Sequence, residues 1–128
     1  MQDFKKLDVW KKSHKLTLGI YKTTASYPHE ERFGIISQMR RCCTSIPSNI
    51  AEGCGRNSAS QLLHFLNIAS GSVSELEYQL ILSLDLEFVD SDQYHILEVE
   101  VSEVKKMLWS LMQSVRKNTD NQELKTKN

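Results

Sequence analysis

The chain has 128 residues with 16 basic and 16 acidic side chains, so its formal net charge is zero. This length suits one domain with a single core, and the neutral charge argues against a uniformly basic nucleic-acid binder. Two prolines and five glycines leave few helix breakers, which favours long helices over many short strands. No window resembles a membrane span or a signal peptide, and three cysteines do not make a disulfide framework. We therefore expect a cytoplasmic protein.

Charged side chains are segregated along the sequence. Basic residues are in excess up to Arg56, every charged side chain from Asn57 to Val104 is acidic, and the balance is basic again from Lys105. This pattern has two interpretations. It indicates separate basic and acidic surfaces, suited to self-association of unlike faces or to a polyanion, or it marks the solvated faces of helices that pair with one another.

The first predicted helix begins with Asp8 as its N-cap and runs to Tyr27-Pro28, because apolar side chains recur at helical spacing from Val9 onward. Lysines cluster in and before this helix, largely off its apolar side. They suit contact with a phosphate backbone, and equally a solvated helix face. The cluster consists of Lys5, Lys6, Lys11, Lys12, Lys15 and Lys22.

The second predicted helix opens at Pro28 and ends near Gly53 to Gly55. Pro47 lies inside it, removes one backbone N–H and crowds the carbonyl of Cys43, which predicts a kink or a break at a cost of about 3 kcal/mol. Opposite the apolar face runs a polar stripe that suits solvent, a hydrogen-bonded subunit contact, or phosphate recognition by arginine. The stripe consists of Gln38, Arg41, Ser45, Asn49, Glu52 and Arg56.

The third predicted helix is capped by Asn57 or Ser58 and carries the most regular apolar seam of the chain. Further apolar residues widen this seam, which predicts contact with more than one neighbour and hence oligomerisation. Gly71-Ser72 in its middle predicts a close approach by another backbone. The seam consists of Leu62, Leu66, Ala69, Val73, Leu76 and Leu80.

The fourth predicted helix begins at Asp90 or Ser91 and ends near Lys117, and the polar residues 118–128 are predicted to form a disordered tail. Four amphipathic segments with short connections predict an all-α, up-down-up-down antiparallel four-helix bundle over residues 1–117. A di-iron site is not expected, because only Asp92 and His95 approach the required spacing. The sequence has no Cys-x-x-Cys pair and no glycine-rich phosphate loop. We therefore expect no catalytic residues, no metal, no cofactor and no enzyme activity.

The run Gln38, Arg40-Arg41, Ser45-Ile46-Pro47-Ser48-Asn49-Ile50-Ala51-Glu52-Gly53 and Arg56 closely resembles the signature of four-helix-bundle proteins encoded in intervening sequences of bacterial 23S rRNA genes. Val9-Trp10, Pro28, Gly34 and Gly71-Ser72 match in the same order. The resemblance implies a ring-like homopentamer, related to the accessory proteins of diversity-generating retroelements, which bind a reverse transcriptase and nucleic acid. It implies a suspected RNA- or DNA-binding role and no established reaction.

Charge segregation and this resemblance together predict a non-catalytic homo-oligomer whose basic surface binds structured RNA or DNA. The alternative is an adaptor that holds a protein partner, such as a reverse transcriptase, without reading nucleic acid itself. Neither hypothesis involves a membrane. The candidate nucleic-acid-binding residues are Lys5, Lys6, Lys11, Lys12, Lys15, Arg40, Arg41 and Arg56.

Overall fold

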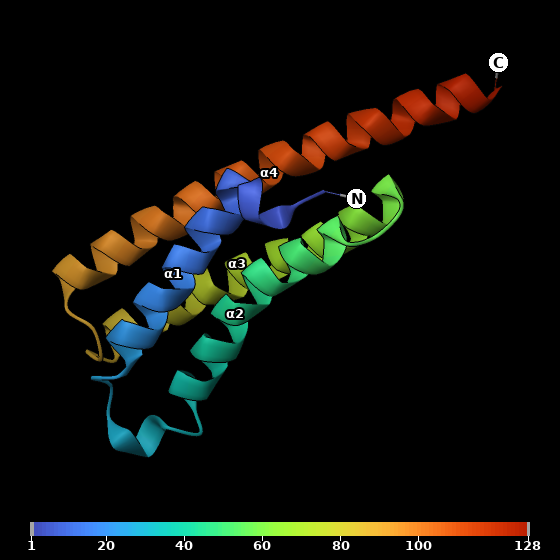
Figure 1. The fold of residues 1–128 in the computed structure, drawn as a ribbon. Coiled ribbons are helices and arrows are strands. Elements are labelled where there is room, and N and C mark those ends of the chain that lie inside the picture. Colours follow the sequence, from blue (N-terminus) through green and yellow to red (C-terminus); the bar gives the residue numbers. More distant parts are fainter. Residues whose placement is uncertain (1, 128) are drawn as a thin grey trace.

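Residues 2–127 are described by a computed structural model, and the side chains described are those of residues 2–119. Each long helix packs against two others, α1 and α3 both contacting α2 and α4. Consecutive helices run in opposite directions (Figure 1). The predicted all-α four-helix bundle is confirmed. Its elements are η1 (Phe4–Lys6), α1 (Asp8–Thr24), η2 (His29–Glu31), α2 (Ile35–Cys54), α3 (Ala59–Asp85) and α4 (Ser91–Lys127).

The starts of the first two helices differ from the sequence prediction. Asp8 is the first residue of α1 rather than its N-cap, which is Leu7. There the carboxylate lies in the first turn, where the helix dipole favours negative charge. The second helix does not open at Pro28, because the segment after it forms the separate 3₁₀ turn η2. Gly34 then takes a non-helical conformation, with φ −106° and ψ −117°, and α2 begins only at Ile35.

The starts of α3 and α4 follow the predicted caps. The Ser58 hydroxyl accepts a hydrogen bond from the Gln61 N–H at 3.1 Å, and the Asp90 carboxylate accepts one from the Gln93 N–H at 2.8 Å. Side-chain oxygens at these positions satisfy donors that the first helical turn leaves free.

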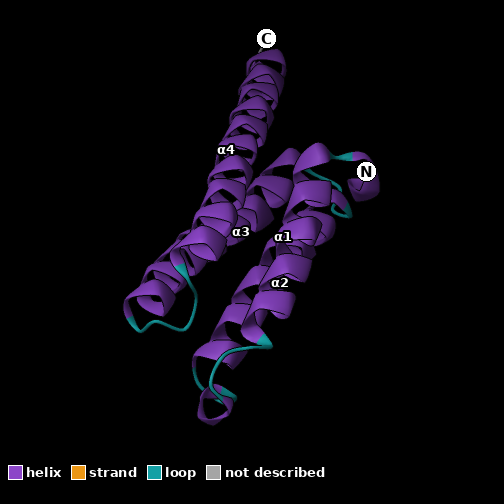
Figure 2. Ribbon diagram, turned by 90° about the vertical axis from the view of Figure 1, so that its left-hand side faces the viewer, coloured by secondary structure: helices purple, strands orange, loops and turns teal. Residues whose placement is uncertain are grey.

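The end of α4 lies beyond the predicted one. The helix does not stop near Lys117 but continues to Lys127, and its last turns extend past the other helices (Figures 1 and 2). The sequence between these residues holds no glycine or proline that would end a helix. The disorder predicted for residues 118–128 stays a prediction, because the side chains from residue 120 onward lie outside the described residues.

Pro47 does not break α2, which continues through it. Without an N–H at position 47, the Cys43 carbonyl loses its helical donor. The hydroxyl of Thr17, on α1, lies 3.1 Å from the Cys43 oxygen and 2.8 Å from the Ser13 oxygen one turn back on its own helix. Both Thr17 and Cys43 are buried, so water cannot replace this donor. A side chain of α1 therefore offers the carbonyl that the proline leaves unpaired a hydroxyl hydrogen, which it shares with the Ser13 carbonyl.

Two glycines have opposite surroundings. At Gly53 of α2, a Cβ would lie 2.9 Å from Leu62 Cδ1 and 3.1 Å from Phe65 Cβ, so this glycine permits the close packing of α2 on α3. At Gly71 of α3, a Cβ would meet nothing within 4 Å. The close approach predicted at Gly71 is thus not made within the described part of this chain, although glycine there costs about 1 kcal/mol relative to alanine.

We expect Thr17→Val to lower the free energy of unfolding by about 1–3 kcal/mol, because it leaves the buried Cys43 carbonyl without a donor. Urea denaturation followed by circular dichroism measures this change. Thr44→Val is the matched control: Thr44 also donates to the carbonyl four residues earlier, at 2.7 Å from the Arg40 oxygen, but it is exposed. It should change stability by no more than about 0.5 kcal/mol.

A double-mutant cycle distinguishes the loss of the hydrogen bond to the Cys43 carbonyl from a general loss of packing around Thr17. Pro47→Ala restores an N–H to the Cys43 carbonyl, so Thr17→Val should cost about 1 kcal/mol less in that background than in the native one. Equal costs in the two backgrounds would show that the hydroxyl does not compensate for the proline.

Candidate nucleic-acid interface

The middle of the polar stripe lies between helices. The amide of Asn49 donates to the Ser45 carbonyl at 2.8 Å and to its hydroxyl at 2.9 Å. That hydroxyl lies 2.9 Å from the hydroxyl of Ser72, on α3. The Cys42 thiol donates to the Ser72 carbonyl at 3.0 Å. This part of the stripe is therefore a hydrogen-bonded contact of α2 with α3 inside the chain.

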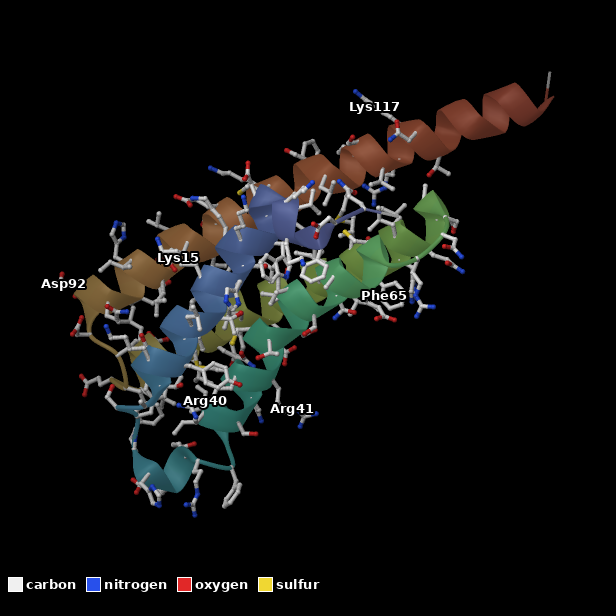
Figure 3. The ribbon with its side chains drawn as sticks, viewed as in Figure 1. Lys15, Arg40, Arg41, Phe65, Asp92 and Lys117 are labelled. Carbon is white, nitrogen blue, oxygen red and sulfur yellow. The ribbon has the colours of Figure 1, made fainter. Side chains whose placement is uncertain are left out.

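Arg56, at the end of the stripe, interacts with its own fold. Its guanidinium pairs with Glu52 one turn earlier and stands 4.9 Å from the ring centroid of Phe65. Phe65 belongs to α3 (Figure 3). The ion pair and the cation–π contact hold Arg56 beside α3, so its charge is partly matched within the chain.

The two adjacent arginines of α2 have different surroundings. Arg40 Nε donates to the Thr24 hydroxyl at 3.0 Å, its Nη2 donates to the Tyr21 carbonyl at 3.2 Å, and its guanidinium lies 4.7 Å from the centre of the Tyr21 ring. These contacts place a cation at the C-terminal end of α1, where the helix dipole favours it. Arg40 is half-buried and fastens α1 to α2, which makes it a structural residue as well as a basic one.

Arg41 points away from α1 (Figure 3). It is exposed, and within the described side chains it has no hydrogen bond or ion pair. It borders a polar depression of about 510 Å³ between α2 and α3, together with Gln38 and Glu75. Glu77, two residues after Glu75 and therefore on another side of α3, pairs instead with Lys105 at 3.4 Å. Arg41 is therefore the charged residue of the stripe that remains available to a ligand or to another chain.

The lysines of the first segment lie on two sides of α1. Lys12 pairs with Glu103 of α4 at 2.6 Å, which raises the pKa of Lys12 and lowers the pKa of Glu103. Lys11 and Lys15, at helical spacing, lie on the exposed side of the helix. Lys15 also lowers the pKa of Glu103 by its nearby positive charge. Acidic residues of α4 thus reduce the positive potential of this side of α1, but among the described side chains they form an ion pair with only one of these three lysines.

Lys5 and Lys6 extend the basic face in η1, where both are exposed. The structure therefore divides the predicted basic residues into three groups. Lys5 and Lys6 on η1, with Lys11 and Lys15 on α1, are four exposed lysines close together in the sequence, and we call them the lysine face. Arg41 stands separately on the outside of α2. The remaining candidates, Lys12, Arg40 and Arg56, contact their own fold.

Nucleophile and metal chemistry has no assembled site in the described residues. Burial raises the pKa of Cys42 to about 12 and that of Cys43 to about 11, and it also raises the pKa of Cys54. His14 stacks on Trp10 with ring centroids 5.2 Å apart. No group of three or more His, Cys, Asp or Glu residues that could hold a metal ion occurs among the described residues. No helix in this part of the chain is long and apolar enough to cross a membrane.

The fold places this chain in the class of all-α four-helix-bundle proteins, and its most distinctive sequence, the polar stripe around Pro47, lies on α2. A model of the 23S rRNA-intervening sequence protein family matches residues 5–110, and the chain belongs to that family. This confirms the resemblance seen in the sequence.

A solved structure agrees with this assignment. It is the crystal structure of a protein of unknown function from the S23 ribosomal protein family of Bacteroides thetaiotaomicron, 30% identical, with a TM-score of 0.74. The alignment covers 81% of this chain and 97% of that one. Comparison with curated proteins gives no match.

We expect the three native cysteines to react slowly with a thiol reagent such as Ellman's reagent in the folded protein at pH 8. The pKa of Cys42 rises from 9.0 to about 12, which lowers its thiolate fraction at pH 8 about a thousandfold. Ser48→Cys, at an exposed position of the same helix, is the control and should react fast. All three thiols should react once the protein is unfolded in guanidinium; fast reaction of a native thiol before unfolding would contradict the burial.

Proposed function

We propose that this protein is a non-catalytic, homo-oligomeric bundle that binds RNA or DNA through the lysine face. The observation that carries the proposal is the group of exposed lysines on η1 and the outer side of α1, of which Lys11 and Lys15 have no ion pair within the described side chains. Lysines on one side of a rigid helix can neutralise successive phosphates and release counterions. The family's connection with ribosomal RNA genes supports RNA as the ligand to test first.

Homo-oligomerisation is part of this proposal, and the resemblance seen in the sequence implies a pentameric ring. Large apolar side chains remain exposed three positions apart on the same side of two helices, Leu18 with Tyr21 on α1 and Tyr78 with Ile81 on α3. Exposed apolar side chains that gather on one side of a helix indicate contact with another molecule. Sedimentation equilibrium at micromolar concentration measures the mass directly, and a monomer under these conditions would contradict this part of the proposal.

The second candidate function is an adaptor for a protein partner, and one observation favours it. Phe33, in the connection before α2, is 85% exposed, and the Arg32 guanidinium lies 4.8 Å from the centre of its ring. An aromatic side chain beside an arginine is typical of an energetically dominant contact at a protein interface. Phe33→Ser should abolish capture of such a partner and leave RNA affinity unchanged.

For the first candidate, we expect Lys11→Gln with Lys15→Gln to weaken binding of a fluorescent RNA hairpin and to reduce the slope of log K against log salt by about 2. Fluorescence anisotropy from 50 to 200 mM KCl measures both quantities. The matched control, Lys106→Gln with Lys117→Gln, removes the same charge from exposed positions of α4 and should have a much smaller effect.

Arg40 is unsuitable for this test, because its hydrogen bonds to Thr24 and Tyr21 stabilise the fold. Equal losses in the α1 and α4 double variants would show that only net charge matters, and no binding at 50 mM KCl would reject direct recognition of nucleic acid.

A further inference from the structure

One side of α3 faces away from the bundle and is partly apolar. Ile68 is 41% exposed and Tyr78 is 60% exposed. Gly71 and Glu75 lie between them. With His64 included, the five residues follow one another at intervals of four, three, four and three positions. This is the spacing of a helix–helix seam. We call Ile68, Gly71, Glu75 and Tyr78 the outer α3 stripe; it lies opposite the buried seam of the same helix.

Gly71 is the point of this stripe where another backbone could come closest. It is exposed, and a Cβ there would meet no atom of its own chain. Gly53 shows the contrast, since α3 occupies the space that its side chain would need. The described part of the fold therefore gives no packing reason for a glycine in the middle of α3, whereas an approach from outside the chain does.

A groove of about 510 Å³ lies between α1 and α2 on another side of the molecule. Its α1 wall includes Trp10, Leu18 and Tyr21, and its α2 wall includes Pro47 and Ala51. Leu18 is 58% exposed and Tyr21 is 43% exposed. No lysine, arginine or acidic side chain lines the groove. It is a mostly apolar surface that the described chain leaves uncovered.

The stripe and the groove are similar in length, and the charges around them are opposite in sign. At 1.5 Å per helical residue, Ile68 to Tyr78 spans about 15 Å, and Trp10 to Tyr21 spans about 17 Å. The helices that form the groove carry six basic and two acidic side chains, whereas every charged side chain of α3 is acidic. Glu75 stands within the stripe. Apolar surfaces of similar length in fields of opposite sign favour contact with each other.

The two surfaces cannot meet within one molecule. The groove lies on α1 and α2, whereas the stripe faces outward from α3, which packs against α2 and α4 but not against α1. Figure 2 shows α1 beside α2, and α3 beside α4. A contact between stripe and groove therefore requires two copies and uses a different surface on each.

We propose that the outer α3 stripe of one copy docks in the α1–α2 groove of a second copy. The inference rests on the proposed homo-oligomeric function and specifies which surfaces meet. Such a head-to-tail contact leaves one free stripe and one free groove on every pair, so further copies add until a ring closes.

Three variants test this contact by sedimentation. The stripe variant, Gly71→Gln with Tyr78→Gln, blocks the close approach and removes the aromatic ring. The groove variant, Leu18→Glu, places an acidic group against the acidic stripe. Each should weaken association at least about tenfold and give mainly monomers at micromolar concentration, with circular dichroism unchanged because the altered side chains are exposed. Ile96→Gln, at an exposed apolar position of α4, is the control and should keep the native mass.

Mixing the two defective variants gives the sharpest result. The stripe variant keeps an intact groove and the groove variant keeps an intact stripe, so an equimolar mixture should form a dimer with one copy of each and no larger species. A wild-type monomer would reject the proposed homo-oligomer itself. A wild-type oligomer whose mass neither variant changes, or two monomeric variants that form no mixed dimer, would overturn the stripe-to-groove contact and leave homo-oligomerisation standing.

Discussion

The buried carbonyl of Cys43 is the constraint on which the arrangement of the first two helices depends. Pro47 removes its helical donor, and an unpaired carbonyl in the core would cost about 1–3 kcal/mol. The Thr17 hydroxyl supplies the donor from α1, which fixes both the distance and the register of α1 against α2. Arg40, one turn before Thr44, adds a second connection by donating to Thr24 and Tyr21 near the end of α1. A proline that weakens an isolated helix thus helps to specify a helix pair.

On its other side, α2 is aligned with α3 by small residues. Gly53 lets the backbones approach at one end, and the Ser45 and Ser72 hydroxyls meet near the middle. Small side chains bring polar groups of both helices within hydrogen-bond range. Most side chains of the polar stripe of α2 therefore have their hydrogen-bond or ion-pair partners inside the chain. The signature of this family therefore has a structural account in Ser45, Pro47 and Gly53. Among the charged residues of the stripe, only Arg41 is left without a hydrogen bond or ion pair in the described part of the chain.

Apolar periodicity was sufficient to predict the four-helix architecture, because the seam of α3 and the caps at Ser58 and Asp90 are local signals. Features that depend on a distant partner were not predictable. The role of Thr17 requires knowing that α1 crosses α2 at Cys43, and the pairing of Lys12 with Glu103 joins residues 91 positions apart. The end of α3 is also unmarked in the sequence, since Glu87 rather than a glycine takes the left-handed conformation there, with φ 62°.

The same limitation applies to the candidate interface. The sequence places eight basic residues in one set, but only packing shows that Arg40 and Arg56 contact aromatic rings while Lys11 and Lys15 face outward. A single copy with zero net charge offers a phosphate backbone few cations, and acidic residues of α4 stand close to them. A closed assembly of identical copies would repeat the lysine face around its circumference. Contacts that are weak individually then act together at high effective concentration, so a neutral protein can bind a polyanion if it first binds itself.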